Sequence, residues 1–104
     1  MLDHKRYPFT AWAVSSAPAD PGVYGLWLDG ELIYIGSASS PGATIQSRLA
    51  DHLAQEGADG RKIATEYAWE LSRNARVREV ELLEEYRRQF QRYPLLNRRS
   101  SDAG

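Results

Sequence analysis

The stretch GVYGLWLDGELIYIG, residues 22–36, decides the fold of this chain. Apolar and aromatic side chains dominate it, and Asp29-Gly30 sits near its middle. An Asp-Gly pair between two apolar runs is among the strongest short-range signals for a β-hairpin. We therefore predict one strand over residues 22–28 and a second over residues 31–36, joined by a tight turn.

The length of that turn determines which side chains share a face of the sheet, because side chains alternate along a strand. A two-residue turn pairs Leu28 with Glu31 and places Tyr24 and Tyr34 on opposite faces. A three-residue loop with a left-handed Gly30 places the two tyrosines directly opposite each other. Local propensity slightly favours the first register. A shared role for the tyrosines requires the second, or a bulge elsewhere, and we predict the second.

The remainder of the chain predicts two helices and one further strand. Residues 44–55 form a helix with Thr44 at its N-cap, and residues 62–71 alternate as a half-buried strand. The longest helix covers residues 76–92 and is stopped by Pro94. Its expected apolar stripe consists of Val80, Leu82, Leu83, Tyr86, Phe90 and Tyr93. The expected fold is α+β, with a small three-stranded antiparallel sheet flanked by helices.

The expected organisation is a single folded domain between two polar ends. Residues 1–21 form an N-terminal segment and loop, in which residues 1–8 are loosely ordered and residues 9–14 are either a short strand or a helical turn. The domain itself covers residues 22–98, and residues 99–104 are a disordered tail. Residues 37–43 are expected to be a loop and residues 57–60 a turn.

Composition excludes several classes of protein. A chain of 104 residues with 42% hydrophobic and 26% charged residues is long enough for one globular domain and not for two. The absence of cysteine excludes disulfides and thiolate metal sites, and two histidines are too few for a multi-histidine cage. No long apolar run or signal-peptide pattern is present, so we expect no membrane association and a cytoplasmic location.

Charge is distributed unevenly along the chain, although the net charge is only −1. Residues 1–60 hold three Lys or Arg and seven Asp or Glu, whereas residues 61–104 hold ten and seven, a net charge of 10 − 7 = +3. The small net charge argues weakly against a protein that binds nucleic acid by itself. The basic second half makes nucleic-acid binding more plausible than the net charge suggests.

Two triplets on the predicted hairpin, Gly22-Val23-Tyr24 and Tyr34-Ile35-Gly36, resemble the paired signature of the GIY-YIG nuclease superfamily. Valine stands where the first triplet usually has isoleucine. The family carries an arginine on the following helix, often with a histidine four residues later, and Arg48 and His52 fit that spacing. Residues four apart lie on the same face of a helix.

Two further motifs complete the resemblance, which covers about residues 20–98. The family has a metal-binding glutamate near the start of a later helix, followed by an apolar pair and an aromatic residue, and Glu79 has that context. It also has Pro-x-x-Asn near the domain end, as in the segment that ends at Asn97. In many members this asparagine follows the glutamate by about twelve residues, a distance that fits Glu85 instead. We choose Glu79 for its apolar context and leave Glu81 and Glu85 open.

The resemblance implies an endonuclease that depends on Mg²⁺ or Mn²⁺ and cuts DNA one strand at a time. Glu79 would bind the metal, because magnesium is commonly held by one or two carboxylates together with water and phosphate. Arg48 would bind the phosphate and stabilise the charge of the transition state with its planar, permanently ionised guanidinium. Gly36 and Ser37 would let the backbone come close to the substrate.

The same resemblance assigns the remaining candidate residues to proton transfer and positioning. Tyr24 would activate the attacking water or relay its proton, with Tyr34 hydrogen-bonded in the same site and His52 accepting or passing a proton. Asn97 would orient a site residue or the phosphate. The alternative is a non-catalytic module of the same fold that binds nucleic acid or protein. Both hypotheses are compatible with a partner protein that supplies specificity for the target.

Overall fold

The computed structural model describes residues 2, 5–56 and 62–97, and it has the expected α+β class. Its sheet is antiparallel and four-stranded in the order β1-β4-β2-β3, so the prediction of three strands is wrong. The elements, in chain order, are β1 Tyr7–Pro8, α1 Ala11–Val14, β2 Gly22–Leu28, β3 Glu31–Ala38, α2 Ile45–Glu56, β4 Glu66–Leu71 and α3 Ala75–Phe90.

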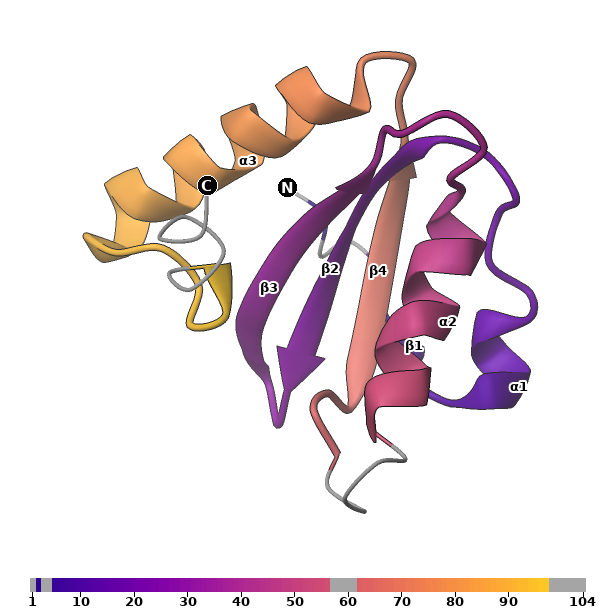
Figure 1. Ribbon diagram of the computed structural model, residues 1–104. Helices are drawn as coiled ribbons and strands as arrows, with labels where there is room; N and C mark the ends of the chain where they lie inside the picture. Colours follow the sequence, from indigo (N-terminus) through magenta and orange to yellow (C-terminus); the bar gives the residue numbers. More distant parts are fainter. Residues whose placement is uncertain (1, 3–4, 57–61, 98–104) are drawn as a thin grey trace.

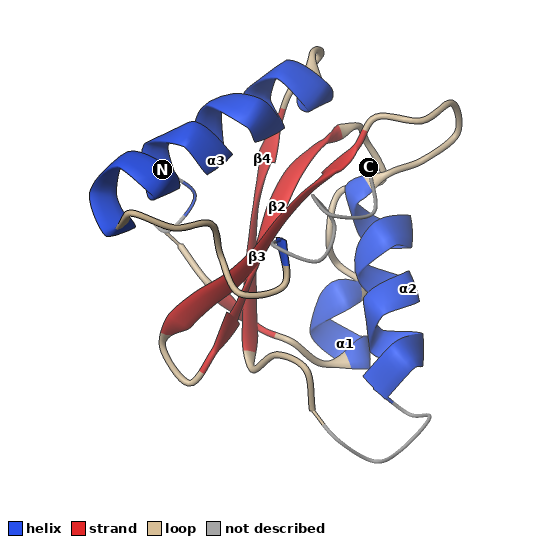
Figure 2. Ribbon diagram, turned by 60° about the vertical axis from the view of Figure 1, so that its left-hand side comes forward, coloured by secondary structure: helices blue, strands red, loops and turns tan. Residues whose placement is uncertain are grey.

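The sheet lies between two helical layers. Figure 1 shows α1 and α2 side by side on one face and α3 across the other, and Figure 2 shows β3 toward the viewer between α2 and α3. Each face has its own buried cluster, with Tyr24, Leu26 and Tyr67 facing α2 and with Val23 and Ile35 facing α3. The central strand β2 is therefore buried on both sides, and β3 forms an edge of the sheet.

The hairpin has the two-residue turn, so the predicted three-residue loop is wrong. Leu28 pairs with Glu31, and both turn residues, Asp29 and Gly30, have positive φ angles of 50° and 89°. A bulge then leaves Ile33 without a pairing partner on β2. With a two-residue turn, the two tyrosines can share a face only if a bulge shifts the register, and the extra residue Ile33 forms that bulge. Ile33 and the following tyrosine both pack into the cluster that faces α2.

The next strand in sequence, β4, begins later than predicted and is more buried. Glu56 accepts hydrogen bonds from the backbone N–H groups of Ile63 and Ala64, at 2.9 and 3.1 Å, so this segment bonds to a helix end rather than to a neighbouring strand. Tyr67 and Ala68 are both buried, on opposite faces. The prediction of a half-buried strand over residues 62–71 is thus wrong in two ways: the strand begins at Glu66, and both of its faces carry buried residues.

The N-terminal segment contributes more order than predicted. Tyr7 and Pro8 form the fourth strand against β4, and the Tyr7 ring stacks on Tyr67 with centroids 5.5 Å apart. Leu2 is buried in the cluster facing α3. The undecided segment 9–14 contains the helical turn α1.

The two long helices match their predictions closely. Thr44 caps α2, since its hydroxyl accepts from the Ser47 N–H at 3.0 Å, as predicted. Helix α3 ends at Phe90, where Gln91 adopts a left-handed conformation, rather than at residue 92. The predicted stripe of α3 is too wide, because the side chains of Val80 and Phe90 are about half exposed.

Several predictions concern the ends of elements or lie outside the described residues. The loop predicted over residues 37–43 is shorter, because β3 continues to Ala38. The turn at 57–60 and the tail at 99–104 fall outside the described residues. None of the helices in the described part of the chain has the length and apolar character needed to cross a bilayer.

Candidate functional site

Three of the candidate side chains meet on the α2 face of the sheet. The Tyr24 hydroxyl lies 2.9 Å from Nε2 of His52, and the ring centroids of Tyr24 and Tyr34 are 6.1 Å apart. The Tyr34 ring also contacts His52, at 5.3 Å between centroids. Tyr24 is fully buried, whereas Tyr34 and His52 are partly exposed. The cluster therefore holds one buried phenol beside two partly exposed rings.

Gly36 is required where these rings meet. It pairs with Tyr24 across the hairpin, and a Cβ atom at position 36 would come within 2.6 Å of the Tyr24 ring and 2.7 Å of the Tyr34 ring. Such distances are far inside van der Waals contact, so a side chain here would displace both rings. Gly36 thus makes room for the two tyrosine rings. The role predicted for it from the sequence is a different one, a close approach of the backbone to the substrate.

Arg48 belongs to the same group of residues. It lies one helical turn before His52 on α2, and its guanidinium is close enough to Tyr24 to lower the pKa of that phenol. Its side chain is 46% exposed and makes a long ion pair with Asp51, at 3.9 Å. Exposed pairs of this kind contribute little to stability. The guanidinium is therefore held loosely at the surface of the cluster, where an incoming anion can reach it.

The electrostatics of the cluster favour neutral groups. Burial, and secondarily the neighbouring Tyr34, raises the pKa of the Tyr24 phenol far above its ordinary value, and this outweighs the opposite effect of Arg48. Burial and then Arg48 lower the pKa of His52, against a smaller opposing effect of Asp51. With a protonated phenol and a neutral imidazole, Tyr24 donates to His52 Nε2 in the tautomer that carries the imidazole proton on Nδ1.

We expect this arrangement to make stability depend on pH through His52. Because its pKa is lowered on folding, the unfolded chain binds more protons below about pH 6.5, so stability is lost as the pH falls through that range. Thermal unfolding of wild type and His52→Gln between about pH 5 and 8 measures this, and the variant should show the flatter profile. Equal slopes for the two proteins would contradict the burial of a neutral imidazole.

Glu79 approaches from the other face of the sheet. Its Oε1 accepts a hydrogen bond from the Ser37 hydroxyl at 2.7 Å, and Ser37 follows Gly36 on β3, so its side chain points toward α3. The two groups, Glu79 with Ser37 and Tyr24 with its neighbours, therefore flank the same segment of the edge strand from opposite faces. Nothing in the local sequence links residues 37 and 79, and sequence reasoning did not anticipate this contact.

The other glutamates of α3 are less suited to this position. Glu81 accepts from the Arg78 guanidinium at 3.1 Å, and Arg78 also binds Glu70 at 2.6 Å, which ties α3 to β4. Glu85 lies six residues beyond Glu79, about 9 Å further along the helix axis. Glu79 is thus the carboxylate of α3 that contacts β3 beside the tyrosines.

Asn97 bonds to the backbone of the edge strand β3. It is 4% exposed, its Oδ1 accepts from the Ile35 N–H, and its Nδ2 donates to the Ile35 carbonyl, both at 2.8 Å. The Leu96 N–H adds a bond to the Ile33 carbonyl at 2.9 Å. Asn97 therefore continues the hydrogen bonding of the sheet past its edge strand. Both amide groups bond to the backbone of Ile35, which lies between Tyr34 and Gly36, so Asn97 holds the strand that carries these two residues. Its predicted role toward the phosphate stays a prediction.

A metal would have a single carboxylate to bind at this site. Among the described residues, no group of three or more His, Cys, Asp or Glu side chains converges as a metal cage. Glu79 and the Ser37 hydroxyl supply hard oxygen donors, and such a set suits Mg²⁺ when water and phosphate complete the coordination. The donor chemistry thus fits the ion that the resemblance implies.

Comparison with known proteins adds no relative. No family model, no curated protein and no solved structure matches this chain. The resemblance to GIY-YIG nucleases therefore rests on the motif residues of the sequence alone.

Proposed function

We propose that this protein is a metal-dependent endonuclease of the GIY-YIG type that hydrolyses phosphodiester bonds of DNA, one strand at a time. The observation that carries the proposal is the hydrogen bond between Tyr24 and neutral His52, beside Tyr34 and the exposed Arg48. These residues come from two strands and a helix, and sheet packing alone does not require a histidine and an arginine at that place.

In the proposed reaction, the phenol and the imidazole act as a proton relay. For this step a water molecule has to enter beside the buried Tyr24 hydroxyl; it transfers its proton to the phenol oxygen while the phenol passes its own proton to His52 Nε2. The resulting hydroxide attacks phosphorus, His52 becomes an imidazolium, and the bond to the leaving oxygen breaks with its electron pair on that oxygen. A solvent water then protonates the leaving oxygen, and the imidazolium returns its proton to solvent. This route avoids a free phenolate, which the raised pKa of Tyr24 makes costly.

Arg48 stabilises the negative charge that develops on the phosphate oxygens, because its guanidinium can donate two parallel hydrogen bonds. A divalent cation held by Glu79 would supply further positive charge to the phosphate and the leaving group. Ser37 keeps the Glu79 carboxylate in place through its hydroxyl. A phosphodiester lying along the edge of β3 would face the Arg48 guanidinium on one side and, on the other, the cation that Glu79 would hold.

We expect supercoiled plasmid to be nicked in Mg²⁺ or Mn²⁺ and to stay intact with a chelator. Glu79→Gln should slow nicking by about a hundredfold, because it removes the charge that binds the cation while keeping an acceptor for Ser37. Glu85→Gln, on the same helix, is the matched control and should cut like wild type. Loss of cutting in the Glu85 variant alone would move the metal site along α3. A wild type that leaves plasmid and branched DNA intact would favour the non-catalytic alternative.

A further inference from the structure

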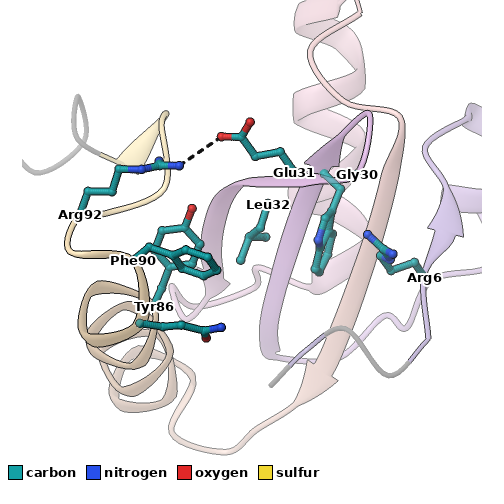
Figure 3. A pocket seen from close by; sticks show the side chains of 9 residues that line it. Arg6, Gly30, Glu31, Leu32, Tyr86, Phe90 and Arg92 are labelled. Carbon is teal, nitrogen blue, oxygen red and sulfur yellow. Dashed lines mark hydrogen bonds and ion pairs between the residues drawn. The ribbon is translucent and has the colours of Figure 1, made fainter.

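A second concave site lies at the opposite end of the hairpin, on the α3 face. It is a cavity of about 450 Å³ between the hairpin turn and the last turns of α3 (Figure 3). Leu32, in its lining, is five residues from Ser37 on β3, about 16 Å along the strand. The cavity is therefore separate from the candidate catalytic cluster and has a size typical of small-molecule sites.

Aromatic rings form two sides of this cavity. Tyr86 and Phe90 contact each other with ring centroids 4.5 Å apart, and Figure 3 shows both on one side, across from Arg6. Phe90 is 46% exposed, so part of its ring is open to a ligand. Trp27 also lines the cavity, with the Arg6 guanidinium 5.3 Å from its ring centroid. A flat group that enters the cavity can stack on the Phe90 ring, and the cation–π pair of Arg6 and Trp27 lies across the cavity from it.

Two guanidinium groups flank the opening, each held by a weak ion pair. Arg92 lies 3.5 Å from Glu31, the contact drawn in Figure 3, and Arg6 lies 3.6 Å from Glu66. These side chains are between 35% and 56% exposed, and ion pairs at that exposure contribute little. Each arginine can exchange its carboxylate for a phosphate, which accepts two parallel hydrogen bonds from the planar fork.

We propose that this cavity binds one nucleotide, with its base stacked on Phe90 and its phosphate bound by Arg92, while Arg6 supplies positive charge from the other side of the cavity. A base supplies the flat aromatic surface, and the attached phosphate supplies the anion that an apolar peptide lacks. The Glu31 carboxylate, once released by Arg92, can accept a hydrogen bond from an exocyclic amino group of a base. The ligand is either a free mononucleotide or an unpaired nucleotide of a strand. The inference does not depend on cleavage at the other site.

The test is a titration of the ¹⁵N-labelled full chain with AMP, followed by NMR. We expect shifts of the Trp27 indole N–H and of the Glu31 and Phe90 amides. Phe90→Ala should weaken binding about fivefold or more, because base stacking on an aromatic side chain is lost. Arg92→Ala should weaken the binding of AMP more than the binding of adenosine, because adenosine has no phosphate. Val80→Ala, which truncates an exposed apolar residue of the same helix, is the matched control and should bind like wild type.

The outcomes separate the possible ligands. Ribose 5-phosphate that binds as tightly as AMP, or a Phe90→Ala variant with wild-type affinity and a native spectrum, would overturn the proposal. So would shifts that avoid Trp27 at millimolar AMP. Displacement of AMP by a short single strand at lower concentration than by a blunt duplex assigns the nucleotide to a strand. If neither the single strand nor the duplex displaces AMP, the ligand is a free mononucleotide.

Discussion

Replacing Arg48 by alanine is expected to slow DNA cleavage by about a thousandfold while leaving the protein folded. The side chain is half exposed, and its only ion pair, among the described residues, is the long contact with Asp51. Surface changes of this kind alter the free energy of unfolding by less than about 0.5 kcal/mol. The loss of activity would therefore report the missing guanidinium rather than a damaged fold.

The measurement is the single-turnover nicking rate of plasmid in Mg²⁺, together with thermal unfolding. Arg87→Ala is the matched control, because Arg87 is 53% exposed and pairs with a carboxylate three residues away at 3.3 Å, yet lies on α3. Arg48→Lys keeps the charge without the planar fork and should recover only part of the rate. Similar losses in the Arg87 and Arg48 variants would mean that general electrostatics, and not a specific phosphate contact, limits cleavage.

The hairpin illustrates what local sequence can and cannot predict. Asp29-Gly30 specifies its turn directly, because both positions need positive φ and these residues tolerate it. The register beyond the turn depends on Ile33, whose side chain is buried together with Tyr34 on the α2 face. The burial of Ile33 on that face results from tertiary packing, and an alternating pattern of residues does not predict it. Only the requirement that two tyrosines share a face pointed to a bulge.

The errors elsewhere have the same physical origin. A two-residue strand that contains Pro8 carries no recognisable pattern, and it forms because Tyr7 can stack on Tyr67. In the candidate site, residues at helical spacing, Arg48 and His52, could be placed together from sequence. The contact of Glu79 with Ser37 spans 42 residues and could not. Local periodicity thus predicts elements, whereas the pairs that assemble the site depend on how the elements pack.

Replacing Asn97 by alanine is expected to destabilise the protein more than any surface substitution, by about 2–4 kcal/mol. The change removes two buried hydrogen bonds and leaves the N–H and carbonyl of Ile35 without their partner at the edge of the sheet. For a domain of this size that corresponds to a fall in Tm of roughly 10–25 °C, measured by calorimetry or circular dichroism. Asn74→Ala is the matched control, since the Asn74 side chain makes no capping hydrogen bond, and its Tm should change little.

Asn97→Asp distinguishes the two hydrogen bonds from the volume of the side chain. The introduced carboxyl group can still accept from the Ile35 N–H, but its second oxygen faces the Ile35 carbonyl and must be protonated to bond there. Folding therefore raises the pKa of that group, so its stabilisation is present in acid and is lost as the pH rises above about 4. We expect this variant to approach wild-type stability only at low pH, whereas Asn97→Ala remains destabilised throughout. If the difference between each variant and wild type stays constant at every pH, the bond to the Ile35 carbonyl contributes nothing to stability.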